Sequence, residues 1–272
     1  MFCKLENEQV NWYYGIPRWM VVSNLSEIGL NSNFLLVYCY LDRWRNIKYE
    51  FSSSVLKILH DLGSDYKGNN KKNFPALGRD ILNSLSFMEE NNMIQVVKGD
   101  YKKANEEFII TINKDNFLSN DNYVVMNSNY LDFIMSSKSS IKKGNLLQVL
   151  LYTLSTHIET LNYNQETSET WVHWYQVFSQ SNKKTAQAIG ISDKTVEKAL
   201  GVLSSTTPSD NKPLIVYYVA PICTKKGNVV KFPNIYTENS EGWEKRIKKE
   251  IKYYKGKIDK IGYEGGNGNG NY

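Results

Sequence analysis

The chain has few of the residues that build metal sites, disulfide frameworks and catalytic centres. Three cysteines and three histidines are scattered through 272 residues, at Cys3, Cys39, Cys223, His60, His157 and His173. No C-x-x-C pair, no H-E-x-x-H sequence and no pair of histidines flanking one hydrophobic residue occurs, which argues against a zinc site, a disulfide framework and a metal-dependent nicking enzyme. We therefore expect no metal ion, no cofactor and a reducing compartment.

The motifs of nucleotide-driven and nucleophilic enzymes are also missing. The phosphate loop, G-x-x-x-x-G-K followed by Ser or Thr, does not occur, and neither does the nucleophile elbow G-x-S-x-G. We therefore predict that the protein is not an enzyme. The first residues have no apolar signal core, and no stretch approaches the roughly 18 apolar residues that cross a bilayer. These features lead us to expect a cytoplasmic protein without a membrane partner.

The chain does contain enough apolar and aromatic residues for packed cores, and its length suits two domains. Hydrophobic residues make up 41% of it and charged residues 22%, with 19 Tyr, 10 Phe and 6 Trp. Its 33 basic and 28 acidic residues leave a net charge of +5, which allows an anionic partner without requiring one. The distribution of the basic residues along the chain therefore matters more than their sum.

The segment KKTAQAIGISDKTVEKALGVL, residues 183–203, has the spacing of a helix-turn-helix. Gly190 lies at the turn, where a positive φ is needed, and Ser192 suits the N-cap of the next helix. The segment resembles the helix-turn-helix of many bacterial regulators, in the form A-x-x-x-G-I/V-S-x-x-T-V-x-x-x-L. We expect the outward residues of the second helix to contact DNA in the major groove, although some winged helices bind protein instead. These residues are Ser192, Asp193, Lys194, Thr195, Glu197 and Lys198.

The sequence around this motif predicts a winged helix. We expect a first helix over residues 144–159, a small strand at Trp171–Trp174, and two wing strands, Leu214–Val219 and Val229–Tyr236. Basic residues at the start of the motif and at the wing tip are expected to contact phosphates or the minor groove. The alternative for the wing tip is a solvated hairpin turn. The basic residues are Lys183, Lys184, Lys225 and Lys226.

The first half of the chain follows the same order of patterns. The expected elements are helices over 30–44, 52–63 and 75–91, and strands over 47–51, 93–97 and 108–112. A polar insertion over residues 64–73 replaces the tight turn between the second and third helices. Lys71 and Lys72 in this insertion, with Arg79 after it, could form a phosphate-contacting patch; the alternative is a basic surface loop with no partner.

Three segments of this first half resemble a known family. They are the opening YYGIPRWM, the segment LLVYCYLDR, and SFMEENNMIQVV. They look like the winged-helix proteins of plasmids, phages and integrative elements of low-GC Gram-positive bacteria, and are similar to replication initiators and replisome organisers of the RepA N-terminal type. The resemblance covers residues 12–112 and implies a DNA-binding module with no catalytic residue. No helicase- or primase-loading domain is recognisable after it, which keeps transcriptional control open.

The last apolar pattern lies near the end of the chain, where Trp243, Ile247 and Ile251 begin a helical stripe that continues to Ile261. Residues 241–260 hold eight basic and four acidic side chains. This helix could pack on the wings, pair with a second subunit or lie along DNA. We predict a contribution to a weak or DNA-stabilised dimer.

We predict an α+β fold, mainly helical, of two tandem winged-helix domains, each a helix-turn-helix plus a β-hairpin wing, and a C-terminal amphipathic helix. The predicted parts are a first domain over 12–118, a linker with a short helix over 119–143, a second domain over 144–237, a basic amphipathic helix over 238–262 and a flexible Gly/Asn tail over 263–272.

The function predicted from these patterns is sequence-specific binding of double-stranded DNA at a control region of a plasmid, phage or integrative element, with replication initiation favoured. The alternatives are a transcriptional regulator of the same fold and a protein-docking adaptor in a replisome or partition complex. The expected partners are double-stranded DNA, a second copy of the chain, and replication or transcription proteins.

Overall fold

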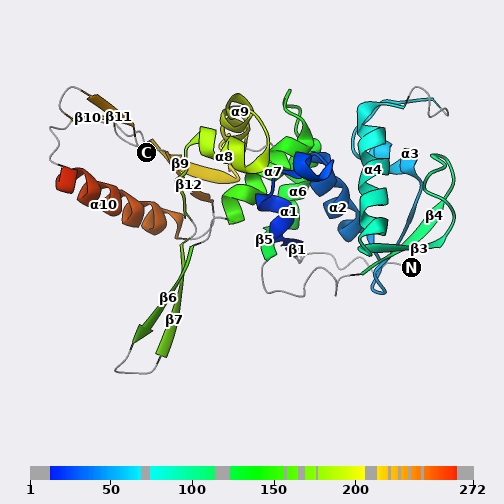
Figure 1. Ribbon diagram of the computed structural model, residues 1–272, viewed down its shortest axis with the longest axis horizontal. Coiled ribbons are helices and arrows are strands. Elements are labelled where there is room, and N and C mark those ends of the chain that lie inside the picture. Colours follow the sequence, from blue (N-terminus) through cyan, green and yellow to red (C-terminus); the bar gives the residue numbers. More distant parts are fainter. Residues whose placement is uncertain are drawn as a thin grey trace, which may run out of the picture. The chain divides into compact units, whose positions relative to one another are not determined.

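The computed structural model describes residues 13–68, 74–113, 123–155, 158–164, 169–175, 177–205, 213–219, 222–225, 228–231, 234–239 and 242–261. The chain divides into two compact units (Figure 1). Unit 1 is Met1–Arg18 with Leu30–Lys138, and unit 2 is Trp19–Gly29 with Ser139–Tyr272. The described parts combine helices with small antiparallel sheets, so the predicted α+β class is confirmed.

Unit 1 is built around three helices and a three-stranded sheet. Most bounds lie close to those expected from the sequence, but the strand expected over 47–51 lies at Glu50–Ser53, and its last two residues fall within the range expected for the following helix. In the sheet, strand β4 pairs with β2 on one side and β3 on the other, both antiparallel. The elements are α2 (Asn33–Trp44), β2 (Glu50–Ser53), α3 (Val55–Asp61), α4 (Ala76–Glu90), β3 (Ile94–Lys98) and β4 (Phe108–Ile112).

Local sequence explains these elements. Burial alternates along β4, where Phe108 and Ile110 face the core, as a sheet with one covered face requires. Ser54 caps α3 because its side chain accepts the N–H of Lys57 at 3.3 Å. In α4, Ile81 repeats at helical spacing with Leu85 and Met88, and all three are buried. The apolar stripes of the helices thus close over one face of the sheet.

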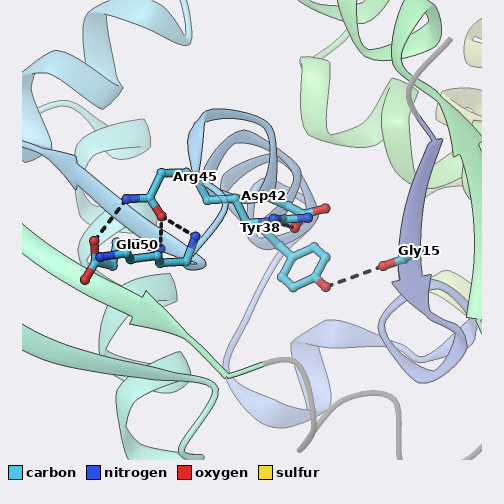
Figure 2. A network of polar contacts seen from close by, with 7 residues as sticks. Gly15, Tyr38, Asp42, Arg45 and Glu50 are labelled. Atoms are coloured by element: carbon cyan, nitrogen blue, oxygen red, sulfur yellow. Dashed lines mark hydrogen bonds and ion pairs between the residues drawn. The ribbon is translucent and has the colours of Figure 1, made fainter. Parts of the chain in front are cut away.

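Unit 1 also contains a strand pair that the sequence did not predict. Strand β1 (Tyr13–Pro17) pairs antiparallel with β5 (Tyr123–Asn127), which leads into α6 (Ser128–Ser136). Figure 2 shows the Tyr38 side chain of α2 reaching toward β1, where its hydroxyl donates to the Gly15 carbonyl at 3.5 Å. Arg43 of α2 and Asp132 of α6 form an ion pair. Part of the stretch expected to be a linker thus packs within unit 1.

Unit 2 repeats this order with additions. Strand β12 lies between β8 and β9, again antiparallel to both. The elements are η1 (Leu25–Ile28), α7 (Lys143–Ser155), β6 (Ile158–Asn164), β7 (Glu169–Tyr175), β8 (Val177–Phe178), α8 (Asn182–Ile189), α9 (Asp193–Leu203), β9 (Ile215–Tyr218), β10 (Ile222–Lys225), β11 (Asn228–Lys231), β12 (Ile235–Glu238) and α10 (Trp243–Ile261); helix α1 (Arg18–Val22) begins at the boundary with unit 1.

Two strand predictions in this unit need correction. The segment Trp171–Trp174 belongs to β7, which pairs with β6 as a separate hairpin (Figure 1), and β8 takes the expected place in the three-stranded sheet. The expected strand Val229–Tyr236 is two strands, β11 and β12. Pro221 and Pro233 stand near the breaks in the sequence, and proline has no N–H to give to a ladder.

The four strands β9 to β12 nevertheless keep one register. Tyr218 lies opposite Ile235 in the first ladder, and Ile222 lies opposite Lys231 in the second, four residues further along each strand. The second ladder ends with Lys225 opposite Asn228, and Lys226 and Gly227 of the expected tip lie outside the described residues. The two ladders therefore form one interrupted antiparallel hairpin.

Helix α10 covers part of the sheet of unit 2. Ile247 is 4% exposed and lies in a core cluster with Ile235 of β12, against which Trp243 and Ile251 pack. Arg246 secures the contact, because its Nε donates to Thr237 Oγ1 at 3.1 Å and its Nη2 to the carbonyl of Glu238 at 3.0 Å. The first part of the apolar stripe is thus buried against the sheet of the same chain. Self-association of the helix stays a prediction.

Within the described ranges, no helix is long and apolar enough to cross a membrane.

Candidate nucleic-acid interface

Helices α8 and α9 meet at a tight turn in unit 2. Gly190 ends α8 in the left-handed region with φ 72°, and its N–H donates to the Ala186 carbonyl at 2.9 Å. Two residues later Ser192 caps α9, its Oγ accepting the N–H of Thr195 at 3.1 Å. The turn and cap lie where the sequence predicted them. Glycine suits this turn because a side chain at positive φ is strained.

The core behind the turn fixes the direction of α9. The predicted stripe of Val196, Leu200 and Leu203 is buried. Gln148 of α7, which is 1% exposed, donates its side-chain amide to the Ile189 carbonyl at the end of α8, at 3.2 Å. A buried amide bonded to a helix-end carbonyl satisfies a group that the helix leaves unpaired. Helix α7 therefore holds the end of α8 from which α9 departs.

A second feature closes the turn from outside the motif. The segment Trp19–Gly29 belongs to unit 2, and Asn24 caps η1 there by accepting from the backbone N–H of Ser26. A Cβ at Gly190 would lie 1.8 Å from Asn24 Oδ1. Glycine is thus required both by its backbone conformation and by this close approach. No sequence pattern linked residues so far apart in the chain.

The outward face of α9 carries charges of both signs. Asp193, Lys194, Glu197 and Lys198 are exposed, and none takes part in an ion pair among the described residues. Asp193 accepts the backbone N–H of Lys194 at 2.8 Å. Ser192 is also exposed, while Thr195 is half-buried and its hydroxyl lies 2.8 Å from Ser192 Oγ. Five of the six expected contact residues are thus open to a partner, and Thr195 mainly supports the cap.

The predicted phosphate-contacting residues of unit 2 are only partly placed. Lys183 and Lys184 are exposed in the first turn of α8, where Ser181 caps the helix by accepting the Lys184 N–H. The backbone of Lys225 ends β10. Its side chain and all of Lys226 lie outside the described residues.

Tyr236 of β12 connects the sheet to α9. Burial raises the pKa of its hydroxyl, and the charges of Tyr217 and Glu197 raise it further, against a lowering by the hydrogen bond from Asn234. The ring stacks on that of Tyr217, with centroids 5.7 Å apart. The largest cause of this shift is burial, and Glu197 of α9 contributes the least of the four causes.

In the described part of the chain, the corresponding region of unit 1 has fewer exposed basic residues that could contact phosphates. Arg79 is exposed in the first turn of α4, but its Nη1 donates to the Phe74 carbonyl at 2.8 Å. Lys71 and Lys72 lie outside the described residues. Further along the outward side of α4, Asn83 and Glu90 are exposed. Arg79 is therefore the one basic residue on α4, all of which lies within the described part of the chain.

The described residues contain no group of three or more His, Cys, Asp or Glu side chains that could hold a metal ion. Comparison with protein-family models, with curated proteins and with solved structures gives no match to this chain. The functional argument therefore depends on the geometry described above.

Proposed function

We propose that the protein binds double-stranded DNA sequence-specifically, with α9 of unit 2 entering the major groove. The observation that carries this proposal is the exposed, charged face of α9, held at a fixed angle to α8 by the turn at Gly190. A helix presented in this way by a helix-turn-helix reads base edges with its N-terminal residues. Lys194 and Lys198 are the exposed basic groups on that face.

The order of elements supports a winged-helix assignment for both units. Each has a helix, a strand, two helices and two further strands, and the last strand lies in the middle of the sheet. In unit 2 the β-hairpin after α9 continues in register to Lys225 and Asn228, as a wing would. Lys183, Lys184 and the basic tip would then contact phosphates on either side of the groove.

The mixed charge of α9 favours specific over general DNA binding. Lysine donates to the O6 and N7 acceptors of guanine, and Asp or Glu accepts from the N4 amino group of cytosine. Asp193 and Glu197 would repel phosphates, so they suit a helix that meets base edges better than one that follows the backbone. We propose that base contacts come from α9 and phosphate contacts from the lysines around it.

The proposed biological setting follows the sequence resemblance. We propose a cytoplasmic protein that acts without catalysis at a control region of a plasmid, phage or integrative element, with replication initiation favoured over transcriptional control. The proposed partners are the duplex itself, a second copy of the chain, and replication or transcription proteins. A protein-docking adaptor is the second candidate. The acidic and basic side chains on the exposed face of α9 could also pair with opposite charges on the surface of a partner protein.

Selection from a randomised duplex pool tests the proposal with the full chain. Enrichment of one motif, followed by fluorescence anisotropy at fixed salt, should give at least about a 10³-fold preference over a scrambled duplex. Lys194→Ala should weaken binding to the selected duplex much more than to the scrambled one. A pool without enrichment would contradict the proposal and leave the adaptor as the better hypothesis.

A further inference from the structure

Helix α10 carries a row of lysines on the side away from the sheet. Lys245, Lys248 and Lys252 are exposed and follow one another at steps of three and four, which places them along one face of the helix. None of the three is part of an ion pair in the described region of the chain. At a rise of about 1.5 Å per residue, the row spans about 10 Å.

Lys248 and Lys252 of this row work against the stability of the helix that carries them, although Glu244, four residues before Lys248, offsets part of their repulsion. Lys248 and Lys252 are four residues apart, and like charges at this spacing destabilise an isolated helix. The helix is nevertheless retained by contacts on its other side, through Ile247 and Arg246. Binding of a polyanion along this row would relieve the repulsion between the lysines, which would explain why they are held next to one another.

The apolar face of α10 helps to decide whether the polyanion is a membrane surface or a nucleic acid. An amphipathic helix binds a membrane surface by inserting its apolar face between lipid headgroups. Here Trp243, Ile247 and Ile251 of that face pack against the sheet. Among the described side chains of α10, up to Lys252, the charged face is therefore the one that remains available, which suits contact with phosphates without insertion. A duplex offers about one negative charge per 1.7 Å of its axis, so a row of about 10 Å faces several phosphates.

We propose that the lysine row of α10 binds the phosphate backbone of the same duplex that α9 reads, as a sequence-independent contact. This inference rests on the proposed function. Unit 2 contains 18 basic and 13 acidic residues, which accounts for the whole net charge of +5. Helix α10 is joined to β12, the strand that leads back from the wing, so the row is part of the unit that carries the other proposed contacts.

The test compares Lys248→Gln/Lys252→Gln with Lys48→Gln/Lys138→Gln in the full chain. Lys48 and Lys138 are exposed in unit 1, so the second pair removes the same charge without touching α10. Affinity is measured over a range of salt concentrations for the selected duplex and a scrambled one. The α10 pair should reduce the slope of log affinity against log salt by up to about 1.8 on both duplexes, at about 0.9 per phosphate. Its ratio of specific to scrambled affinity should stay that of the parent.

The outcomes separate the two proposals. If the parent selects a motif but the α10 pair and the control pair have the same slope, the lysine row is not a DNA contact and the proposed function stands. If the parent binds no duplex, the proposed function fails and this inference fails with it. If the α10 pair loses binding to phosphatidylserine-rich vesicles while its DNA slope is unchanged, the row binds membranes instead. We expect the thermal midpoint of the α10 pair to equal or exceed that of the parent, because removing lysines relieves their repulsion. A lower midpoint together with an unchanged salt slope would also contradict the inference.

Discussion

The two units have the same order of elements but differ in net charge, because unit 1 is neutral and unit 2 is basic. Unit 1 contains 15 basic and 15 acidic residues, whereas unit 2 contains 18 and 13. The sheet topology, with the last strand in the middle, is common to both. A shared topology therefore does not imply a shared partner, because long-range attraction to a polyanion depends on charge. If the proposed function holds, this comparison favours unit 2 as the part that attracts DNA.

The units differ again between the second and third helices. In unit 2 only Gly190, Ile191 and Ser192 separate α8 from α9, so the second helix of the pair leaves at a fixed angle. In unit 1, α3 ends at Asp61 and α4 begins at Ala76. A longer connection constrains the following helix less by itself, and α4 depends more on packing of its apolar stripe. Four sets of variants, from the largest expected effect to the smallest, test how far this difference extends to function.

The largest effect is expected from the outward faces of α9 and α4. Lys194→Ala/Lys198→Ala should weaken binding to the selected duplex by about 1–3 kcal/mol for each base that α9 no longer reads. Arg79→Ala/Asn83→Ala on α4 is the matched change in unit 1 and should have the smaller effect. Lys198 is a better choice than Thr195, whose hydroxyl supports the cap at Ser192. Fluorescence anisotropy measures both, and circular dichroism checks folding. A greater weakening by the α4 pair would reverse the comparison.

The next effect concerns the helix that unit 2 adds to the shared plan. Ile247→Ala should lower the free energy of unfolding of unit 2 by about 2–5 kcal/mol, because it leaves a cavity against Ile235. Ile247→Val, the milder control, should lower it by about 0.5–1.5 kcal/mol. Chemical denaturation of each variant measures the difference. Equal stability of both variants and the parent would show that α10 does not support the sheet.

The turn at Gly190 should give a smaller effect, with Gly29 as its control. Gly29 also has a positive φ, of 74°, but a Cβ there would meet nothing within 4 Å. Gly29→Ala should therefore cost about 1 kcal/mol of backbone strain. Gly190→Ala should cost more, because Asn24 must also move. In an Asn24→Ala background the extra penalty should disappear; thermal unfolding of the four variants measures it, and an undiminished penalty would place its origin elsewhere.

The smallest effect is expected in salt dependence. Lys183→Gln/Lys184→Gln should make the slope of log affinity against log salt shallower by up to about 1.8, and Arg79→Gln by up to about 0.9. Arg79 should fall short of that limit because its guanidinium already donates to the Phe74 carbonyl. Titrations at several salt concentrations measure both slopes. If only one of the two groups changes the slope, the two units do not bind DNA in tandem.

Local patterns predicted the parts of the fold that local physics controls. The bounds of α4 and α10, the turn at Gly190 and the cap at Ser192 follow from helical periodicity and from capping chemistry. Pairing between distant segments was not predictable in this way. Strand β8 has only two residues, too few for any alternation to show, and is recognised only by its pairing with β12.

The same limit applies to the candidate site. The exposed residues of α9 could be predicted because the stripe of Val196, Leu200 and Leu203 fixes the opposite face. The approach of Asn24 to Gly190 left no trace in either local sequence, since it joins segments far apart in the chain. The apolar stripe of α10 could also be predicted, but what covers it could not. The packing of Ile247 against Ile235 shows that the sheet covers the first part of the stripe.

The assignment of Trp19–Gly29 to unit 2 has a consequence for dividing the protein. Unit 1 runs up to Arg18 and resumes at Leu30, so the chain passes between the units more than once. A single cleavage after Lys138 would leave Trp19–Gly29 on the fragment that carries unit 1. The other fragment would keep Gly190 but lack Asn24 beside it. One cut therefore leaves all of unit 1 on the first fragment but an incomplete unit 2 on the second, and recovering unit 2 intact requires Trp19–Gly29 to be supplied again, either in trans or by circular permutation.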